Sequence, residues 1–272
     1  MKPLVAYSVR DPAGLGASRY LVELLGARGC SVQGLVECFD SDVATIAGFD
    51  VDVVDLDQYS QFIDGFNYVI VLSRHRAESG RRTFSVHHPG NPTSVAYGGE
   101  PRRLAIAYPL LAWELLRTYA RVALEMKLED YEVTLEATHH GPTSLRIPVV
   151  FIEIGSTEVE WRDEKARKAM ATTVLDVLTR RLSECNPVAA LGGPHYPSRY
   201  TKASLESNLC FGHIIAKHSL EDSLEDVVKQ AITRNHPEPV KTIIVEKKSL
   251  KSTQRSVVER VAAELNVKIE YW

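Results

Sequence analysis

Six of the nine histidines in the sequence lie in polar segments rich in glycine and proline, where a core histidine is not expected. An imidazole exchanges protons near neutral pH and is a common zinc ligand. Two adjacent pairs occur, and we expect at most one member of each to reach a shared site unless the backbone turns there, because neighbours in an extended chain point to opposite faces. A single loop histidine is more often a surface residue, but the set as a whole favours function. Its members are His75, His87, His88, His139, His140 and His195.

Glu153 is a lone carboxylate inside the apolar run 149–154. A carboxylate buried in such a strand is costly unless it has a partner. Its alternatives are a structural ion pair, with Arg74 for example, and a role as metal ligand or general base, which we favour. Gly155 and Ser156 follow, and amides there can hold a developing oxyanion. Capping of the next helix by Ser156 or Thr157 is the equally weighted alternative.

Short apolar runs alternate with amphipathic segments, which is typical of an α/β fold. They predict strands at 4–9, 32–38, 51–56, 68–73, 132–138, 149–154, 187–191, 209–216, 240–245 and 267–271. Helices are predicted around 20–25 and at about 109–127, 163–182, 224–233 and 253–265. We therefore expect a three-layer α/β/α fold with a mixed, mostly parallel sheet, and a single domain that covers residues 1–272.

Four of the predicted strands end in residue types that can do chemistry, at 73–75, 138–140, 153–156 and 192–195. Ligands of open α/β sheets bind beyond the carboxyl ends of parallel strands, so these groups are expected to meet at one sheet edge. The polar segment 74–103 has no predicted element, and a stretch of this length inside a domain is usually functional. We expect it to form an active-site loop over that edge.

The formal net charge is −3 and the calculated pI is about 6.3, which argues against coating nucleic acid by bulk charge. Local basic groups remain, and they are either solvated surface or phosphate contacts. One group contains Arg74, Arg76, Arg81 and Arg82, and the other contains Lys241, Lys247, Lys248, Lys251 and Arg255.

The four cysteines form no C-x-x-C pair, so we expect reduced, mostly buried thiols in a cytoplasmic protein. No apolar run approaches the roughly 20 residues of a membrane span. The composition, 44% hydrophobic and 25% charged, is that of an ordinary soluble domain. Nothing in the sequence points to an obligate protein partner.

Taken together, five motifs resemble the D-aminoacyl-tRNA deacylase family of archaea and plants. The resemblance implies a phosphorylase/hydrolase-like α/β/α fold and an archaeal or plant source, of which the compact chain suits the archaeal one. It also implies zinc as cofactor and hydrolysis of the ester that joins a D-amino acid, such as D-Tyr, to the 3′ end of tRNA in the cytoplasm. The motifs are His87-His88-Pro89-Gly90-Asn91-Pro92, Thr138-His139-His140-Gly141-Pro142, Glu153-Ile154-Gly155-Ser156, Gly192-Gly193-Pro194-His195-Tyr196 and Phe211-Gly212-His213.

Roles within these motifs are assigned here from the residue chemistry. His88, His140, His195 and Glu153 are the expected zinc ligands and, with Ser156, the expected catalytic residues. Glu153 would orient or deprotonate the attacking water. The residues expected to bind the aminoacylated 3′ end are Arg74, His75, Arg76, Asn91, Gly155 and His213.

Two other functions share some of these features. A zinc-dependent hydrolase or phosphorylase relative that acts on a small molecule would need the histidines but no basic surface. A non-catalytic RNA-binding module would need exposed aromatic platforms, which the sequence does not reveal.

Overall fold

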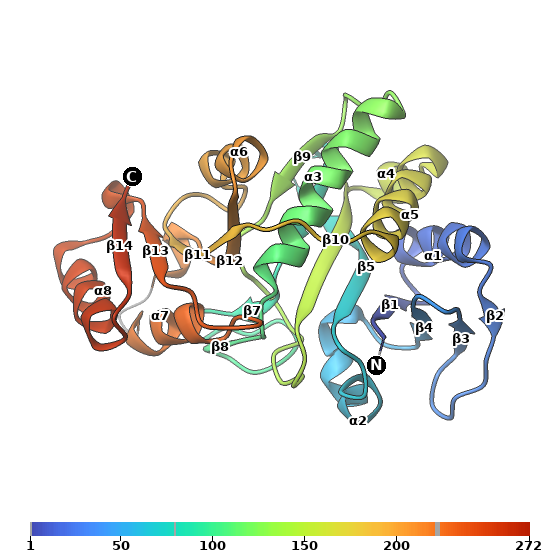
Figure 1. Cartoon of the computed structure of the whole chain (residues 1–272), viewed down its shortest axis with the longest axis horizontal. Coiled ribbons are helices and arrows are strands. Elements are labelled where there is room, and N and C mark those ends of the chain that lie inside the picture. The colour runs from blue at the N-terminus through green and yellow to red at the C-terminus, as the bar shows by residue number, and fades with distance from the viewer. Residues whose placement is uncertain (1, 79, 221–223) are drawn as a thin grey trace.

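Two sheets, where the sequence suggests one, organise the computed structural model, which describes residues 2–78, 80–220 and 224–272 (Figure 1). The larger sheet has eight strands, in the spatial order Arg28–Gly29 (β2), Glu37–Asp40 (β3), Thr45–Phe49 (β4), Leu4–Ser8 (β1), Val69–Arg76 (β5), Val149–Ser156 (β10), Thr83–His87 (β6) and Glu132–Leu135 (β9). The smaller has four parallel strands, in the order Leu209–Ile215 (β12), Asn186–Leu191 (β11), Thr242–Val245 (β13) and Lys268–Tyr271 (β14). A short ribbon pairs Gly90–Asn91 (β7) with Arg103–Leu104 (β8).

Helices flank both sheets. The α-helices are Pro12–Leu25 (α1), Ser60–Ile63 (α2), Pro109–Glu125 (α3), Glu158–Trp161 (α4), Glu164–Thr179 (α5), Ser198–Glu206 (α6), Leu224–Thr233 (α7) and Ser252–Glu264 (α8). The 3₁₀ helices are Val53–Tyr59 (η1), Lys217–Ser219 (η2) and Lys247–Ser249 (η3).

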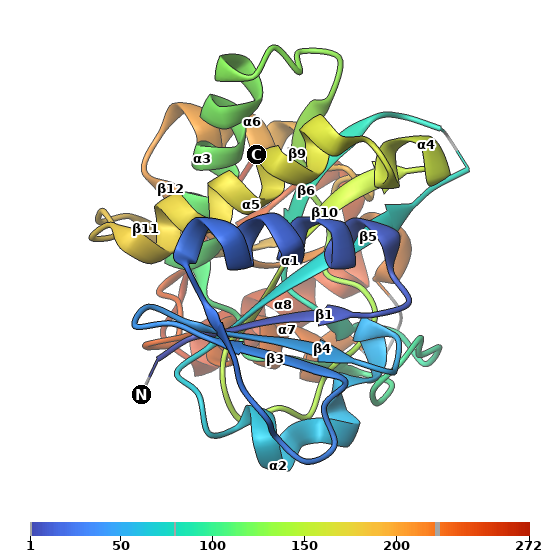
Figure 2. The ribbon, with the colours of Figure 1, turned by 90° about the vertical axis from the view of Figure 1, so that its right-hand side faces the viewer.

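One face of the larger sheet is entirely apolar at its centre. Side chains alternate between faces along a strand, so Ile70 and Leu72 of β5 point the same way as Val150 and Ile152 of β10. All four are fully buried in the cluster formed with α1, α3 and α5, which lie on this side (Figure 2). Burying a side chain of this size contributes about 1.5–3 kcal/mol, so this face anchors the fold.

The opposite face of the same strands changes character along its length. Val69 and Val71 of β5 and Phe151 of β10 pack against η1 and α2. Further along each strand, the same alternation places Ser73 and His75 of β5 and Glu153 of β10 on this face. The carboxyl halves of β5 and β10 therefore present polar groups on a rigid floor.

The smaller sheet is joined to the larger through α3. Helices α7 and α8 cover one of its faces, where Ala189 and Ile243 are buried. Ala190 and Ile244 point to the other face and belong to the same buried cluster as Leu111 of α3. One helix thus packs against strands of both sheets.

Three predicted elements differ from the structure. The segment 74–103 contains β6, whose five residues include Ser85 and His87 and lack the apolar character of a central strand. The run 51–56 is mostly the 3₁₀ helix η1, because Asp52 caps it through the Val54 amide and the neighbouring strand is 45–49. Within the run 32–38, only residues 37 and 38 belong to a strand, β3.

The cysteine prediction is wrong, because the structure pairs Cys30 with Cys38 and Cys185 with Cys210. Strands β2 and β3 bring the first pair to a Cα separation of 5.0 Å, and β11 and β12 bring the second to 5.9 Å. Both separations fall in the range that a disulfide spans. Strand pairing, which is invisible in cysteine spacing, decides the outcome.

In the part of the chain that the structure describes, no helix combines the length and the apolar character needed to cross a bilayer.

The two disulfides should stabilise the fold unequally. The Cys185–Cys210 bridge closes a 25-residue separation and the Cys30–Cys38 bridge an 8-residue one. Loop-closure entropy then predicts losses of about 3.5 and about 2.5 kcal/mol, respectively, when each pair is replaced by alanine. Urea unfolding of both double variants measures this. Adding reductant should break the one disulfide that each variant keeps and lower its free energy of unfolding by the amount predicted for that bridge. Wild-type protein whose unfolding is insensitive to reductant would contradict the prediction.

Candidate active site

The polar floor joins side chains from three adjacent strands. Strand β10 is parallel to β5 and antiparallel to β6, and the register places Gly155 opposite His75 and Glu153 opposite Ser85. His87, at the end of β6, points to the same face, and its Nε2 lies 3.6 Å from Glu153 Oε2. The cluster therefore lies over the middle of the sheet, because β6 is antiparallel to β10 and its last residue, His87, pairs with Phe151 inside β10.

Gly155 allows these side chains to close over the sheet. A Cβ at this position would lie 2.5 Å from Thr83 Oγ1 and 3.1 Å from His75 Cβ. Any larger residue would displace the imidazole from its place above Glu153.

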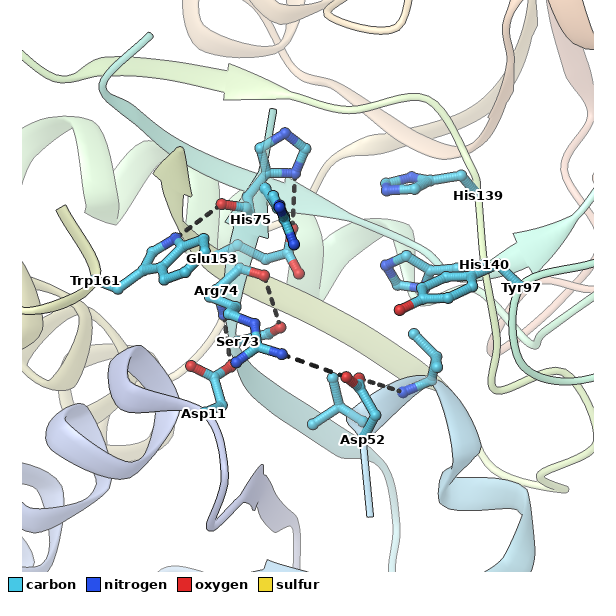
Figure 3. A pocket seen from close by; sticks show the side chains of 13 residues that line it. Asp11, Asp52, Ser73, Arg74, His75, Tyr97, His139, His140, Glu153 and Trp161 are labelled. Carbon is cyan, nitrogen blue, oxygen red and sulfur yellow. Dashed lines mark hydrogen bonds and ion pairs between the residues drawn. The ribbon is translucent and has the colours of Figure 1, made fainter. Parts of the chain in front are cut away.

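A pocket of about 470 Å³ opens over this floor (Figure 3). The carboxyl half of β5, η1, the 139–140 turn and Tyr97 form its walls. Its lining residues are Asp11, Asp52, Val53, Val54, Ser73, Arg74, His75, Arg76, Tyr97, His139, His140, Glu153 and Trp161.

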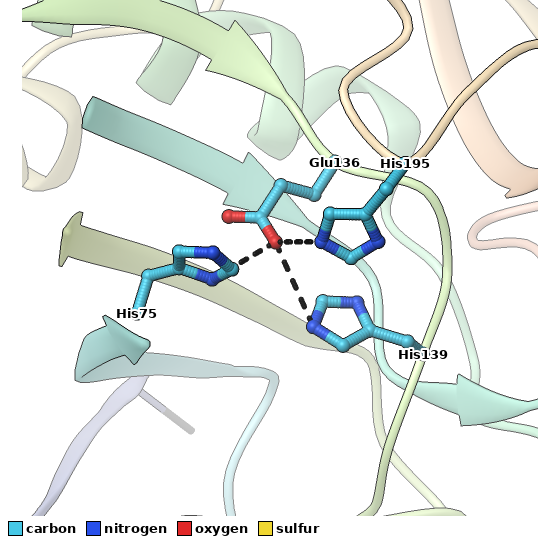
Figure 4. A group of neighbouring side chains, drawn as sticks. All are labelled: His75, Glu136, His139 and His195. Carbon is cyan, nitrogen blue, oxygen red and sulfur yellow. Dashed lines mark hydrogen bonds and ion pairs between the residues drawn. The ribbon is translucent and has the colours of Figure 1, made fainter. Parts of the chain in front are cut away.

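Glu136, just after β9, is surrounded by three imidazoles (Figure 4). Its Oε2 lies 3.1 Å from His75 Nδ1, 2.9 Å from His195 Nε2 and 3.6 Å from His139 Nε2. His195 comes from the loop after β11, in the smaller sheet, so the cluster spans both sheets. On its other side, the His75 Nε2 lies 2.6 Å from the hydroxyl of Tyr196.

Both carboxylates keep oxygen atoms that lack a hydrogen bond. Glu153 Oε2 lies 3.3 Å from His75 Nδ1, outside good hydrogen-bond geometry. Among the described residues, no hydrogen-bond partner faces Glu136 Oε1, Glu153 Oε2 or either ring nitrogen of His87. Buried polar atoms are rarely left in this state, which points to a group that the chain itself does not supply.

The carboxylates and the imidazoles set one another's charge. Burial alone would lower the pKa of His75, but Glu136 and Glu153 outweigh it and raise that pKa to about 10. Burial opposes ionisation of both carboxyls, yet the facing imidazoles hold the pKa of Glu153 at about 2 and that of Glu136 well below its usual range. Burial and neighbouring imidazoles lower the pKa of His140 to about 4 and keep that of His139 well below its usual range. At neutral pH the site therefore contains two carboxylates, a cationic His75 and the neutral rings of His139 and His140.

His139 and His140 both face the pocket because the backbone turns between them. His140 has a φ of 47°, in the left-handed region, and the two ring centroids lie 4.3 Å apart. The Nδ1 atoms of His139 and His140 lie 2.8 and 2.7 Å from the carbonyls of Ala137 and Gly141. A carbonyl only accepts, so each ring carries its proton on Nδ1 and keeps an Nε2 lone pair for a ligand.

These donors fit a divalent cation. Each of three groups brings its ligand atoms within 4.8 Å of one another: His75, Glu136, His139 and His195; His87, His139 and His140; and His87, Glu136 and Glu153. Imidazole and carboxylate are the ligands of catalytic zinc, and neutral rings held by a backbone carbonyl are the usual second shell of such sites. The unpaired oxygens described above are consistent with a cation in this place.

Comparison with known proteins adds the family. The family model described as D-aminoacyl-tRNA deacylase matches residues 62–270. The chain belongs to this family. A D-aminoacyl-tRNA deacylase of Aeropyrum pernix is 48% identical over 278 residues, covering 100% of both chains. One from Hyperthermus butylicus is 43% identical, covering 95% of this chain and 97% of its own.

A solved structure supports the fold. The crystal structure of a conserved protein of unknown function superposes with a TM-score of 0.91 at 28% identity, covering 99% of this chain and 95% of its own. The predicted α/β fold of the phosphorylase/hydrolase-like type, with a mixed and mostly parallel sheet, is confirmed.

Four of the site residues predicted from the sequence lie together in the structure. Glu153, His140, His195 and His75 line the pocket or contact Glu136, and Gly155 lies beneath them. Two more, Arg74 and Arg76, lie on the pocket wall.

His88 and His213 lie elsewhere. The chain is extended at the end of β6, so the ring of His88 points away from that of His87. Its Nδ1 donates to the Val149 carbonyl, and its ring centroid lies 5.9 Å from that of His213. His213 donates from Nε2 to the Ala105 carbonyl and accepts at Nδ1 from Thr138. None of the possible metal-binding groups in the described residues includes His88. The four predicted ligands therefore do not form one set.

Asn91 and Ser156 make local structural contacts. The Asn91 amide donates to the carbonyls of Gly98 and Glu100, and its oxygen accepts from the Tyr97 amide. The hydroxyl of Ser156 donates to the Arg81 carbonyl, 2.5 Å away. Thr157, one of the two residues considered as a cap, caps α4.

The predicted basic group is mostly neutralised within the protein. Arg81 pairs with Glu132, and Arg82 pairs with Asp130 and Glu160. Arg74 stacks over Trp161 with a cation-to-ring distance of 5.5 Å and lies 3.5 Å from Asp52. Arg76 is exposed at the pocket, so it is the arginine of this group best placed for a phosphate.

The sequence-based role assignment left out Glu136, His87, His139 and Tyr196, although the last three lie in the motifs quoted above. Glu136 belongs to the alternating polar positions of the run 132–138, where a solvent-exposed face is the natural interpretation. The only available signal was its place three residues before His139. The contacts of Tyr196 and Glu136 with His75 bridge large sequence separations and could not be inferred.

His213 provides a pH test of its placement. Burial, together with the nearby His88, lowers the pKa of His213 to about 3, against 6.5 in the unfolded chain. Between these two pH values the folded state therefore binds fewer protons than the unfolded chain. The stabilisation that His213 contributes to the free energy of unfolding is complete above pH 6.5 and is lost as the pH falls toward 3. Destabilisation by His213→Gln should be largest at pH 7 and shrink by up to about 1.4 kcal/mol per pH unit on acidification. Urea unfolding at pH 7 and pH 5 measures this; a pH-independent difference would contradict the placement.

Proposed function

We propose that the protein hydrolyses the ester bond of D-aminoacyl-tRNA, with D-Tyr-tRNA among its substrates, and releases free D-amino acid and tRNA at the pocket described above. Such an activity removes mischarged tRNA and serves proofreading. Full-length relatives named D-aminoacyl-tRNA deacylase support it. The observation that carries it is the pair of buried, ionised carboxylates with unpaired oxygens beside neutral imidazoles.

Ester hydrolysis requires a water molecule that is oriented and loses a proton as it attacks the carbonyl carbon. Glu153 is suited to orient that water, because it is ionised at neutral pH and its Oε2 is left without a hydrogen bond by the residues described. His75 holds Glu136 and Glu153 in place from Nδ1 and is itself held at Nε2 by Tyr196. The neutral rings of His139 and His140 complete the wall against which the ester would lie.

The proposal includes zinc as the cofactor. Glu136 with His75, His139 and His195 is the four-residue group that suits it, and His87 and His140 lie next to this group. His75 would join as a ligand only after losing its Nδ1 proton, because a protonated imidazole has no lone pair to offer. When bound, zinc supplies a Lewis acid that polarises a carbonyl oxygen or acidifies a water molecule. This ligand set shares only His195 with the sequence-based one: Glu136, His75 and His139 take the places expected for His88, His140 and Glu153.

The surface beside the pocket suits the tRNA. The Gly193–Pro194 turn that leads to His195 also borders a second hollow, whose ionisable lining residues are Lys217, His218, Lys248 and one acid, Glu246. Within residues 2–78, 80–220 and 224–272, Lys217 and Lys248 make no ion pair, so their charges remain available to phosphates. Lys241, from the same predicted basic group, lies at the other end of β13.

A cytoplasmic location completes the proposal, since aminoacyl-tRNA is found there. Disulfides are rare in most cytoplasmic proteins, but the intracellular proteins of hyperthermophilic archaea and bacteria are an exception. The two bridges are therefore compatible with that location.

Substitution of the carboxylates tests the chemistry. Glu153→Gln should lower kcat on D-Tyr-tRNA about 100-fold or more, because the amide lacks the negative charge and the second acceptor oxygen that orient the attacking water. His140→Ala should also impair turnover. Glu132→Gln is the matched control, because this exposed carboxylate, at the start of the strand that leads to Glu136, pairs at the surface with Arg81. Near-normal turnover in Glu153→Gln and His140→Ala, with and without chelator, would exclude this scheme and favour attack assisted by a tRNA hydroxyl.

Uncharged tRNA should compete, with steep salt dependence, whereas a small-molecule hydrolase would show no such competition.

Metal removal tests the ligand set independently of turnover. Dialysis against a chelator should abolish deacylation, and added zinc should restore it. Elemental analysis should find less bound zinc in His139→Ala and an unchanged amount in His88→Gln, since the ring of His88 points away from the pocket. Loss of zinc from His88→Gln together with retention in His139→Ala would support the sequence-based ligand set instead.

A further inference from the structure

Tyr97 is an exposed aromatic ring at the rim of the active-site pocket. Its side chain is 66% exposed, yet it lines the same pocket as His139, His140 and Glu153 (Figure 3). An exposed apolar ring contributes little to folding, so its presence beside a reactive cluster calls for a binding role.

The loop that carries Tyr97 is held rigidly. The Tyr97 amide donates to Asn91 Oδ1, and its carbonyl accepts from the Gly141 amide at 2.8 Å. Gly98, next to it, has a φ of 63°, and a Cβ there would lie 2.4 Å from the Val54 carbonyl oxygen. The backbone is thus packed directly against η1, so the ring projects from a fixed point and only its side-chain rotamer has to be ordered on binding.

The place of the ring matches one part of the substrate. In an aminoacyl-tRNA the reacting carbonyl is joined through the terminal ribose to the last base, so that base lies one sugar away from the carbonyl. When the ester carbonyl lies over Glu153, the amino acid side chain is on one side of it and the terminal base on the other. Single-stranded RNA ends are commonly recognised by stacking an unpaired base on an aromatic side chain, and this tolerates any tRNA.

We propose that Tyr97 is the platform on which the terminal adenine of the tRNA stacks while the ester is in the pocket. The inference rests on the proposed deacylase function and adds the group that recognises the 3′ end. It also gives Asn91 a role in substrate binding, as a positioning residue that fixes the platform through the Tyr97 amide and the Gly98 carbonyl.

Steady-state kinetics on D-Tyr-tRNA test the proposal. Tyr97→Ala and Tyr97→Leu should raise KM about 5- to 100-fold, the range expected for loss of one base–aromatic stack, with kcat little changed. Tyr97→Phe and Tyr97→Trp should keep the wild-type KM, because stacking needs the ring face and not the hydroxyl. Tyr271→Ala is the matched control, since that tyrosine is 42% exposed on β14 of the smaller sheet.

A binding measurement with uncharged tRNA separates this inference from the deacylase function. Wild-type protein should bind tRNA that ends in CCA more tightly than tRNA truncated to CC, and Tyr97→Ala should bind both equally. A wild-type KM in Tyr97→Ala, a change in kcat alone, or no preference of the wild type for the terminal adenosine would overturn the inference while leaving deacylation intact. If wild-type protein fails to hydrolyse D-Tyr-tRNA but still prefers the CCA end, the proposed function fails and the platform stands.

Discussion

Two carboxylates, Glu136 and Glu153, are buried within contact distance of a single imidazole, His75, whose Nδ1 lies 3.1 and 3.3 Å from their oxygens. Charges so far from water persist only when opposite charge or a cation faces them. The cationic ring meets this need in part, and the oxygens that remain unpaired leave room for a metal ion. The arrangement of strands, the glycine beneath the ring and the loop from the smaller sheet all serve to hold these three groups together.

The reversed strand β6 explains where the site lies. In a fully parallel sheet, reactive groups gather beyond the carboxyl edge. Here β6 runs against β10, so His87 at its end stands above the middle of β10, close to Glu153. Strand β9 is parallel to β6 and delivers Glu136 and then His139 and His140 to the same place. The polar floor is consequently enclosed on several sides, which accounts for the nearly complete burial of its ionisable groups.

The sequence alone predicts most of the fold and part of the site. Long apolar or amphipathic runs such as 149–154 and 109–127 specify their elements, because the periodicity that buries them is local. The segment 83–87 does not, since its strand is defined by pairing with β10 and its own residues are mixed. In the site, Glu153 was predictable as a lone carboxylate in an apolar strand, and one histidine of the pair 87–88 was expected to point inward. Which one does so depends on the register of β6, and the left-handed turn at His140 brings in a second member of the other pair. Neither the register of β6 nor this turn can be predicted from the residue types alone.

The cluster also ties the two sheets to each other. His195 and Tyr196 belong to the smaller sheet's loop, whereas their partners Glu136 and His75 belong to the larger sheet. The Ala137 amide donates to the His195 carbonyl, and the Thr138 amide donates to that of Ile214. A cation or substrate that binds across this junction must also stabilise the docking of one sheet on the other. By thermodynamic linkage, the free energy by which the ligand stabilises the docking equals the free energy by which the docking favours the ligand. Catalytic competence and the cohesion of the two halves of the molecule are therefore two readouts of the same contacts.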